Sequence, residues 1–245
     1  MKKIFIAGGI LAVLLIGVVV MLVLSINPII EKAVNTYGPR LTKSTVHLDE
    51  AEVSFLSGEG ALRGLMIGNP EGFKSPEAMR VDTIRVRVDT DTLTSDTIVI
   101  ELVEVVSPTL TYEKDGGTDN FKALARNIKQ STISKGGSGE GDADAGDSGP
   151  GKKVIIKDFI ITNATMNLAL TALEGKGVTV PVGDVHLKNL GEDKGGATPS
   201  EVFGQVFGTL SGKATSAAGD AIGKMGDQIK KGGETLGGAV KSLFE

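Results

Sequence analysis

The stretch that decides the fold is IRVRVDTDTLTSDTIVIELVEVV, residues 84–106. In residues 84–88 apolar side chains alternate with two arginines, which gives a strand one apolar face and one solvated face. Residues 97–106 are apolar on both faces apart from Glu101 and Glu104, so we expect this second strand to be the most covered. The polar segment between them reads as a turn. The stretch therefore predicts a β-rich body.

Strand patterns continue on both sides of this stretch. Before it, short apolar segments lie between residues 45 and 67, and turns are predicted at 57–60 and 69–72. A helix is expected to begin at Thr118-Asp119-Asn120 and to run to about Ser131. After it, strands are predicted at residues 154–161, 164–170, 178–182 and 185–187. Together these segments predict a mostly antiparallel meander of about eight strands.

Two segments break the strand pattern. Residues 134–152 are dominated by Gly, Ser, Asp and Ala and predict a disordered linker, because they have too little apolar surface to bury. Residues 198–245 open with Thr198-Pro199-Ser200-Glu201, a helix start, and then carry an apolar stripe with an 11-residue period. Ten glycines between Gly204 and Gly238 weaken this helix. We expect it to lean on a membrane, on the sheet or on a second copy of itself.

The N-terminus predicts a membrane anchor. Residues Ile4 to Leu24 are 21 positions without a charge, and as a helix they span roughly 30 Å, the thickness of a bilayer core. A cleaved signal peptide is the alternative, but its apolar region is usually about 7–15 residues and ends in small residues. Lys2 and Lys3 favour a cytoplasmic N-terminus, which places the body in the periplasm.

A short helix is predicted directly after the anchor, from Asn27-Pro28 to Gly38-Pro39. Its apolar positions recur at helical spacing, and Glu31 and Asn35 fall on the opposite, polar face together with Lys32 and Thr36. We expect its apolar face to lie on the membrane surface or to plug one end of the sheet.

Composition argues against several classes of function. The formal net charge is −4, whereas nucleic-acid binding favours a basic excess. The chain has no Cys and only two histidines, His47 and His186, each in an outward-facing strand context beside an acidic residue, Asp49 and Asp184 respectively. Two histidines offer few general bases, and no serine lies in a nucleophile motif. We therefore predict no metal, no cofactor and no catalysis.

Several short motifs, taken together, resemble the AsmA-like family of inner-membrane-anchored periplasmic proteins. They follow the anchor and Asn27-Pro28 in the order GEGALRGL (58–65), IGNPEGF (67–73), LTSDTIVI (93–100), Ser107-Pro108, Tyr112-Glu113 and NFKAL (120–124). This resemblance, and the similarity of that family to chorein-type proteins, implies a bacterial inner-membrane location and a curved sheet forming an apolar groove that handles lipid. About eight strands at roughly 4.8 Å spacing span only about 40 Å, so this chain resembles a short member.

The sequence thus predicts an α+β chain with an N-terminal transmembrane helix, a mostly antiparallel curved sheet and a C-terminal amphipathic helix. The expected parts are an anchor (1–26), an AsmA-like β-rich region (27–133), a linker (134–152), a continuation of the sheet (153–197) and a glycine-rich helix (198–245). The expected function is to bind or shield lipid, or to assist envelope assembly, through an apolar β-groove. Membrane lipids are the expected partners, with other envelope proteins as further candidates. The residues expected to contact lipid are Ile84, Val86, Val88, Met166, Leu168, Leu170, Phe203 and Phe207.

The alternative is a non-catalytic periplasmic scaffold. In that interpretation the C-terminal helix is the missing cover of the sheet, and the core is closed. An open apolar trough favours the lipid interpretation, and a dry, fully covered sheet favours the scaffold.

Overall fold

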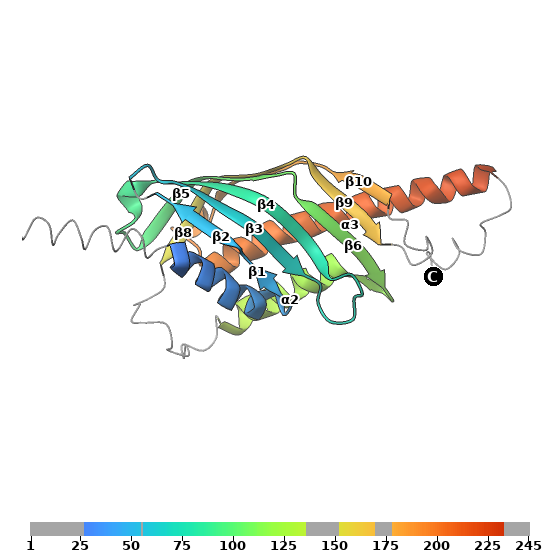
Figure 1. The fold of residues 1–245 in the computed structure, drawn as a ribbon, viewed down its shortest axis with the longest axis horizontal. Coiled ribbons are helices and arrows are strands. Elements are labelled where there is room, and N and C mark those ends of the chain that lie inside the picture. Colours follow the sequence, from blue (N-terminus) through green and yellow to red (C-terminus); the bar gives the residue numbers. More distant parts are fainter. Residues whose placement is uncertain (1–26, 55, 136–151, 170–177, 233–245) are drawn as a thin grey trace, which may run out of the picture.

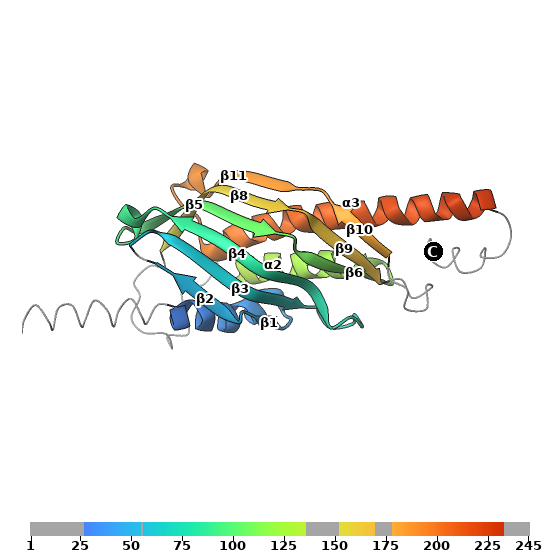
Figure 2. The same ribbon diagram turned by 45° about the horizontal axis from the view of Figure 1, so that its top comes forward.

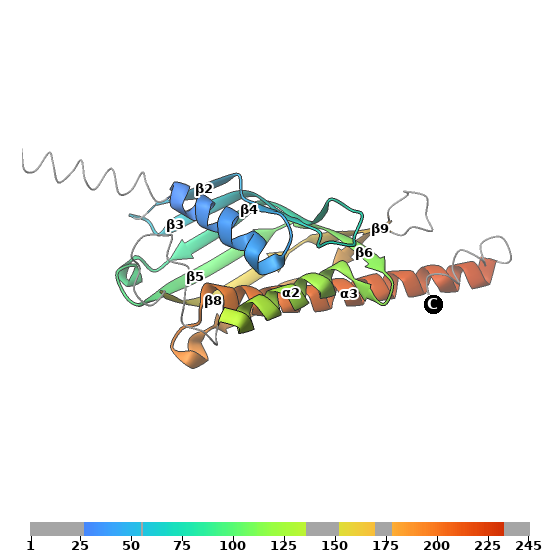
Figure 3. The same ribbon diagram turned by 90° about the horizontal axis from the view of Figure 1, so that it is seen from below.

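The computed structural model describes residues 27–54, 56–135, 152–169 and 178–232. They form two layers, a curved sheet and three α-helices, and all three helices lie on the same face of the sheet (Figures 1 and 3). The predicted α+β class is confirmed. The predicted anchor, Ile4 to Leu24, lies outside the described residues, as does most of the predicted linker. Among the helices described, none combines the length and apolar composition needed to cross a bilayer.

The sheet is mixed and, in the described part of the chain, has eleven strands, so the prediction of about eight strands is wrong in number. Most strand pairs are antiparallel, as predicted, but two are parallel. The strands are β1 (Val46–His47), β2 (Glu50–Val53), β3 (Glu59–Gly68), β4 (Glu77–Val88), β5 (Thr97–Val106), β6 (Thr109–Asp115), β7 (Thr118–Asp119), β8 (Lys153–Thr162), β9 (Ala164–Ala169), β10 (Val178–Val182) and β11 (Val185–Leu190). Parallel pairs join β5 to β8 and β6 to β9. They arise because α2 (Asn120–Lys135) stands between β7 and β8 in the chain and allows a crossover.

Several strands are halves of longer, bent strands. Between Met79 and Arg87, β4 pairs with β6 and then with β5 in one antiparallel register, and β8 and β9 follow β5 and β6 with one parallel offset. The break between β5 and β6 therefore lies beside the break between β8 and β9. Ser107 and Asn163 occupy this line with φ of 53° and 54°, and the Ser107 N–H still donates to the Thr162 carbonyl at 2.8 Å. Two aligned left-handed residues thus bend both strands at the same level without breaking the ladder.

The core lies where α2 and α3 (Pro199–Gly232) cover one end of the concave face. The residues buried there come from both layers: Leu110, Ile161, Met166 and Leu168 from strands, Phe121, Leu124 and Ile128 from α2, and Phe207, Leu210, Ala214 and Ala218 from α3. The stripe predicted for the C-terminal helix is thus partly its contact with the sheet. Figure 2 shows that α3 also continues beyond the sheet.

An acidic side chain caps the N-terminal end of each of the two covering helices. Thr198 and Glu201 form a capping box at the start of α3: the Glu201 N–H donates to the Thr198 hydroxyl at 3.3 Å, and the Thr198 N–H donates to the Glu201 carboxylate at 2.9 Å. The latter bond leads the effects that lower the pKa of Glu201. At α2, buried Asp119 accepts from the Lys122 N–H at 2.9 Å. Burial, with the Asp119 charge and hydrogen bond, raises the pKa of Tyr112 to about 12.

The helix at residues 27–42 packs on the sheet through its polar face as well as through Ile30 and Val34 of its apolar face. Side-chain oxygens of Asn27, Glu31 and Asn35, one helical turn apart, accept the backbone N–H groups of Val53, Ala51 and Leu48 at 3.0, 3.0 and 2.7 Å. These N–H groups belong to Leu48, which follows β1, and to β2 at the sheet edge, where no further strand is paired among the described residues. The unpaired backbone donors of an edge need acceptors, which explains why the polar side chains face inward.

The strand predicted to be most covered is instead open. Of the ten residues of β5, only Val105 is buried, and the apolar side chains towards the other end are only partly buried. The reason is the placement of α2 and α3, which cover the β6 and β9 half of the bent strands. The other half of the concave face is left without this helical cover.

Candidate functional site

An apolar cavity of about 390 Å³ lies at the uncovered end of the concave face. Its walls come from one helix and four neighbouring strands, β2 to β5, with their turns. They are Ile30, Val53, Ser54, Gly58, Gly60, Leu62, Ile84, Val86, Val88, Leu93, Ile98, Ile100 and Val103. Ten of these thirteen are Val, Leu or Ile, and the only side-chain polar group is the Ser54 hydroxyl. The cavity is therefore suited to a hydrocarbon group and offers almost no hydrogen-bonding specificity.

The strand register aims the side chains into this cavity. Val86 faces Val103 across the β4–β5 ladder, and Val88 faces Ile100. A register shift after Arg87 keeps both pairs on the concave side, because β5 carries one extra residue there. Alternation on each strand then makes one continuous apolar surface from β3 to β5.

The turn between β2 and β3 forms one wall of the cavity. Gly58 has φ of 70°, and its carbonyl accepts the Val88 N–H at 2.8 Å, which ties the turn to the end of β4. A Cβ at this position would overlap the Val88 carbonyl oxygen, so only glycine permits this closure. On the other side Ile30, one turn into the helix at 27–42, completes the wall.

The structure divides the residues predicted to contact lipid into two groups. Ile84, Val86 and Val88 line the apolar cavity together, as their alternation indicated. Met166 and Leu168 are both 0% exposed beneath the helices and line none of the described cavities. Their alternation was correct, but α2 and α3 cover that face.

The two predicted phenylalanines belong to the covering helix. Phe207 is buried against Phe121, with ring centroids 6.2 Å apart. Phe203 is partly buried, and its ring centroid lies 5.9 Å from that of Phe207. Both close the core between helix and sheet. Leu170 lies outside the described residues.

The contribution of β5 to the apolar cavity was not predicted from the sequence. Ile98, Ile100 and Val103 line the cavity, although their strand was expected to be the most covered. The signal was present in the unbroken apolar run of residues 97–106. This run does not indicate which part of the strand the helices cover.

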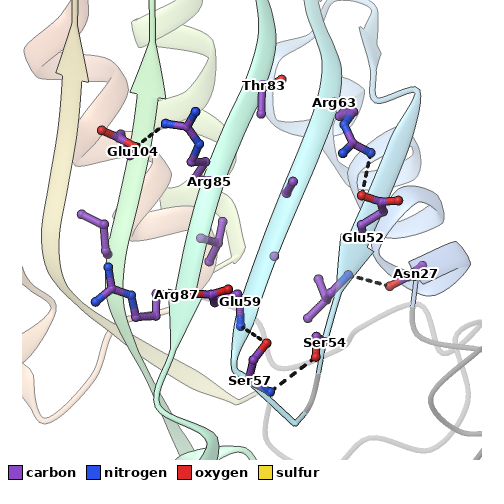
Figure 4. Close-up of a pocket in the computed structure, with 15 residues that line it drawn as sticks. Asn27, Glu52, Ser54, Ser57, Glu59, Arg63, Thr83, Arg85, Arg87 and Glu104 are labelled. Carbon is purple, nitrogen blue, oxygen red and sulfur yellow. Dashed lines mark hydrogen bonds and ion pairs between the residues drawn. The ribbon is translucent and has the colours of Figure 1, made fainter.

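A second, larger hollow of about 860 Å³ lies on the opposite face of the sheet and is charged. Figure 4 shows Arg63, Arg85 and Arg87 there on the side away from the helices, among Glu52, Glu59 and Glu104. Three positive and three negative side chains line the hollow, so their formal charges sum to zero.

Each arginine of this hollow lies beside a glutamate. Arg85 lies 2.9 Å from Glu104, and Arg87 lies 4.0 Å from Glu101. Arg63 lies 2.9 Å from Glu50 and 2.7 Å from Glu52, and these hydrogen bonds raise its pKa. Such cross-strand pairs on an exposed face are typical of a solvated sheet surface and leave no cationic excess for an anion.

The two histidines lie on separate strands, β1 and β11. His47 Nε2 lies 3.1 Å from Asp49, and His186 Nε2 lies 2.7 Å from Asp158 rather than from the neighbouring Asp184. In the described part of the chain, no three His, Asp or Glu side chains are grouped so that they could hold a metal ion.

One buried carboxylate organises a loop far from the cavity. Glu113, 7% exposed, accepts the N–H groups of Lys74 and Ser75 at 2.6 and 2.7 Å. Buried Asn120 accepts the Glu113 N–H and donates to Asn69, so the loop between β3 and β4 is clamped at both ends. Burial alone would raise the pKa of Glu113, but the two N–H donors outweigh it and lower the pKa. This group is a structural clamp.

Comparison with known proteins gave no match: no family model, no curated protein and no solved structure is significantly similar to this chain. The resemblance to the AsmA-like family therefore remains a prediction from the motifs.

Proposed function

We propose that this chain is a non-enzymatic, membrane-tethered protein that binds or shields the acyl part of a lipid in its apolar β-groove. The single observation that supports this is the cavity of about 390 Å³ bounded by β2 to β5, whose walls are almost wholly aliphatic. Its volume is at the lower end of ligand cavities, so it suits one hydrocarbon chain rather than an entire phospholipid.

Burial of a hydrocarbon chain supplies enough free energy for this role. Each buried methylene contributes about 0.8 kcal/mol, so ten methylenes contribute about 8 kcal/mol before the entropy cost of association. An uncharged wall without hydrogen-bond donors favours lipids by their tails and discriminates little among headgroups. The predicted anchor, Ile4 to Leu24, would hold the groove beside its ligand in the bacterial inner membrane, with the body in the periplasm.

The test is lipid mass spectrometry on the full chain purified in detergent. Ile100→Trp places a large ring in the cavity, and we expect the molar ratio of co-purifying lipid to fall several-fold. Leu102→Trp is the matched control, because Leu102 lies on the same strand but lines the charged hollow on the opposite face. We expect this variant to keep its lipid.

Two results would refute the proposal. One is an unmodified chain that carries no lipid above a mock purification, and the other is an equal loss of lipid in Ile100→Trp and Leu102→Trp.

The scaffold alternative has one observation in its favour. α3 buries Phe207, Leu210 and Ala214 against the sheet and α2, as a cover would. The same lipid measurement separates the two functions, since a scaffold without a lipid ligand is unaffected by filling the cavity with Trp.

A further inference from the structure

We infer that the turn between β2 and β3, together with the first turn of the helix at 27–42, forms a hydrophobic tip that inserts into the surface of a lipid bilayer. The purpose of this contact rests on the proposed function, because the tip borders the apolar cavity. The contact itself rests on separate observations of exposure and position.

The first observation is the exposure of large apolar side chains. Among the described residues only three large hydrophobic side chains are exposed, and Leu56 and Ile29 are the most exposed, at 98% and 61%. Scattered exposed apolar residues are normal on soluble proteins, but these two lie on segments that are directly bonded to each other. The Val53 N–H donates to the Asn27 side chain at 3.0 Å, which joins the end of β2 to the start of the helix.

The second observation is the turn that presents Leu56. The Gly58 N–H donates to the Ser54 carbonyl at 2.9 Å, and the Ser57 N–H donates to the Ser54 hydroxyl at 3.4 Å. Figure 4 shows Ser54 and Ser57 at this turn, beside Asn27. Two N–H groups next to Leu56 are therefore bonded within the turn, and this lowers the cost of moving them out of water.

The third observation is the position of the tip relative to the cavity and the chain. Ser54 and Gly58 of the turn and Ile30 of the helix all line the apolar cavity. Residues 1–26, which contain the uncharged run Ile4 to Leu24, directly precede this helix in the sequence. A bilayer at this end would meet both exposed side chains and the cavity wall at once, so an acyl chain could enter without crossing water.

The occupant of this surface is thus a bilayer rather than a protein groove. Leu56 is almost fully exposed on a narrow turn, which offers too little area for a stable protein interface but suits shallow insertion between headgroups. Exposed Lys32 on the same helix supplies a positive charge near the bilayer surface.

The test uses single cysteines in the full chain, which has none of its own. Leu56→Cys, Asp91→Cys and Glu71→Cys are each labelled with an environment-sensitive fluorophore and reconstituted in phosphatidylcholine and phosphatidylglycerol vesicles. All three residues are exposed, so the substitutions leave the core intact. Asp91 is the matched control at the same end of the sheet, because it follows Thr90, which lies beside Gly58. Glu71 lies in the loop after β3, at the opposite end of that strand.

We expect lipids carrying a quencher near the headgroup to quench position 56 several-fold more than position 91, and position 71 hardly at all. Water-soluble iodide should give the reverse order. Equal quenching at positions 56 and 91 would overturn the inference, since anchoring alone brings both near the membrane. The lipid co-purification measured with Ile100→Trp is a separate readout, so failure of the tip and failure of the cavity are distinguishable.

Discussion

Replacing Asn35 by Ala tests whether polar side chains of a helix close the edge of this sheet. The Asn35 amide makes two bonds to one residue: its oxygen accepts the Leu48 N–H at 2.7 Å, and its nitrogen donates to the Leu48 carbonyl at 3.2 Å. Leu48 is 1% exposed, so water cannot replace either bond without opening the edge. Asn35→Ala therefore leaves two buried backbone groups without these partners.

The expected loss follows from those two groups. A buried donor or acceptor left unsatisfied costs about 1–3 kcal/mol, and partial relaxation of the edge offsets some of this cost. We therefore expect the free energy of unfolding to fall by about 1–3 kcal/mol. For a chain of this size about 1 kcal/mol corresponds to about 2–4 °C in Tm, so Tm should fall by about 2–12 °C.

The assay is thermal unfolding of the full chain in detergent, followed by far-ultraviolet circular dichroism. Thr36→Ala is the control: Thr36 is the next residue of the same helix and is exposed. Asn and Thr have similar helix propensities, so both variants gain about the same intrinsic helix stability from Ala. A Tm for Asn35→Ala within about 1 °C of that for Thr36→Ala would refute the role of the side chain as an edge cap.

Two further predictions concern the buried parts of the fold. The pKa of Glu113 is lowered on folding, so its stabilisation is complete above its unfolded pKa of about 4.3 and is lost as pH falls through the folded pKa. Glu113→Gln should flatten the dependence of Tm on pH below about 4.3, and an unchanged slope would contradict the clamp. Phe207→Ala should lower stability by about 3–5 kcal/mol in urea unfolding, and Phe203→Ala by clearly less, because only Phe207 is fully buried. An equal loss of stability in the two variants would contradict this difference in burial.

The sequence predicted the elements better than their arrangement. Alternation located the strands containing Val86 and Leu168, and the Thr198-Pro199-Ser200-Glu201 motif located the start of α3. These patterns are local and depend on two to four neighbouring residues. The parallel pairing of β5 with β8 could not be predicted in this way, because it depends on a crossover that spans residues 107–152.

The candidate site shows the same limit. Ile84, Val86 and Val88 were identified from alternation, whereas Met166 and Leu168 have the same pattern and are closed off by helices. Period-two patterning tells which face of a strand is apolar, and cannot tell whether a helix or a ligand will cover it. For the helix at 27–42, the sequence placed Glu31 and Asn35 on the polar face and predicted contacts only for the apolar face, because helical periodicity carries no information on a neighbouring sheet edge.

Because a helix caps one edge of the sheet, the edges of the sheet differ in whether they can accept another strand. At the side of β1 and β2, side chains take the place that another strand would occupy, so a strand added there would first have to displace Asn27, Glu31 and Asn35. On the far side, β10 and β11 each pair with one strand among the described residues. Any lengthening of this architecture by duplication or insertion would therefore proceed from the C-terminal side, and the segment 27–53 would stay at the start of the enlarged sheet.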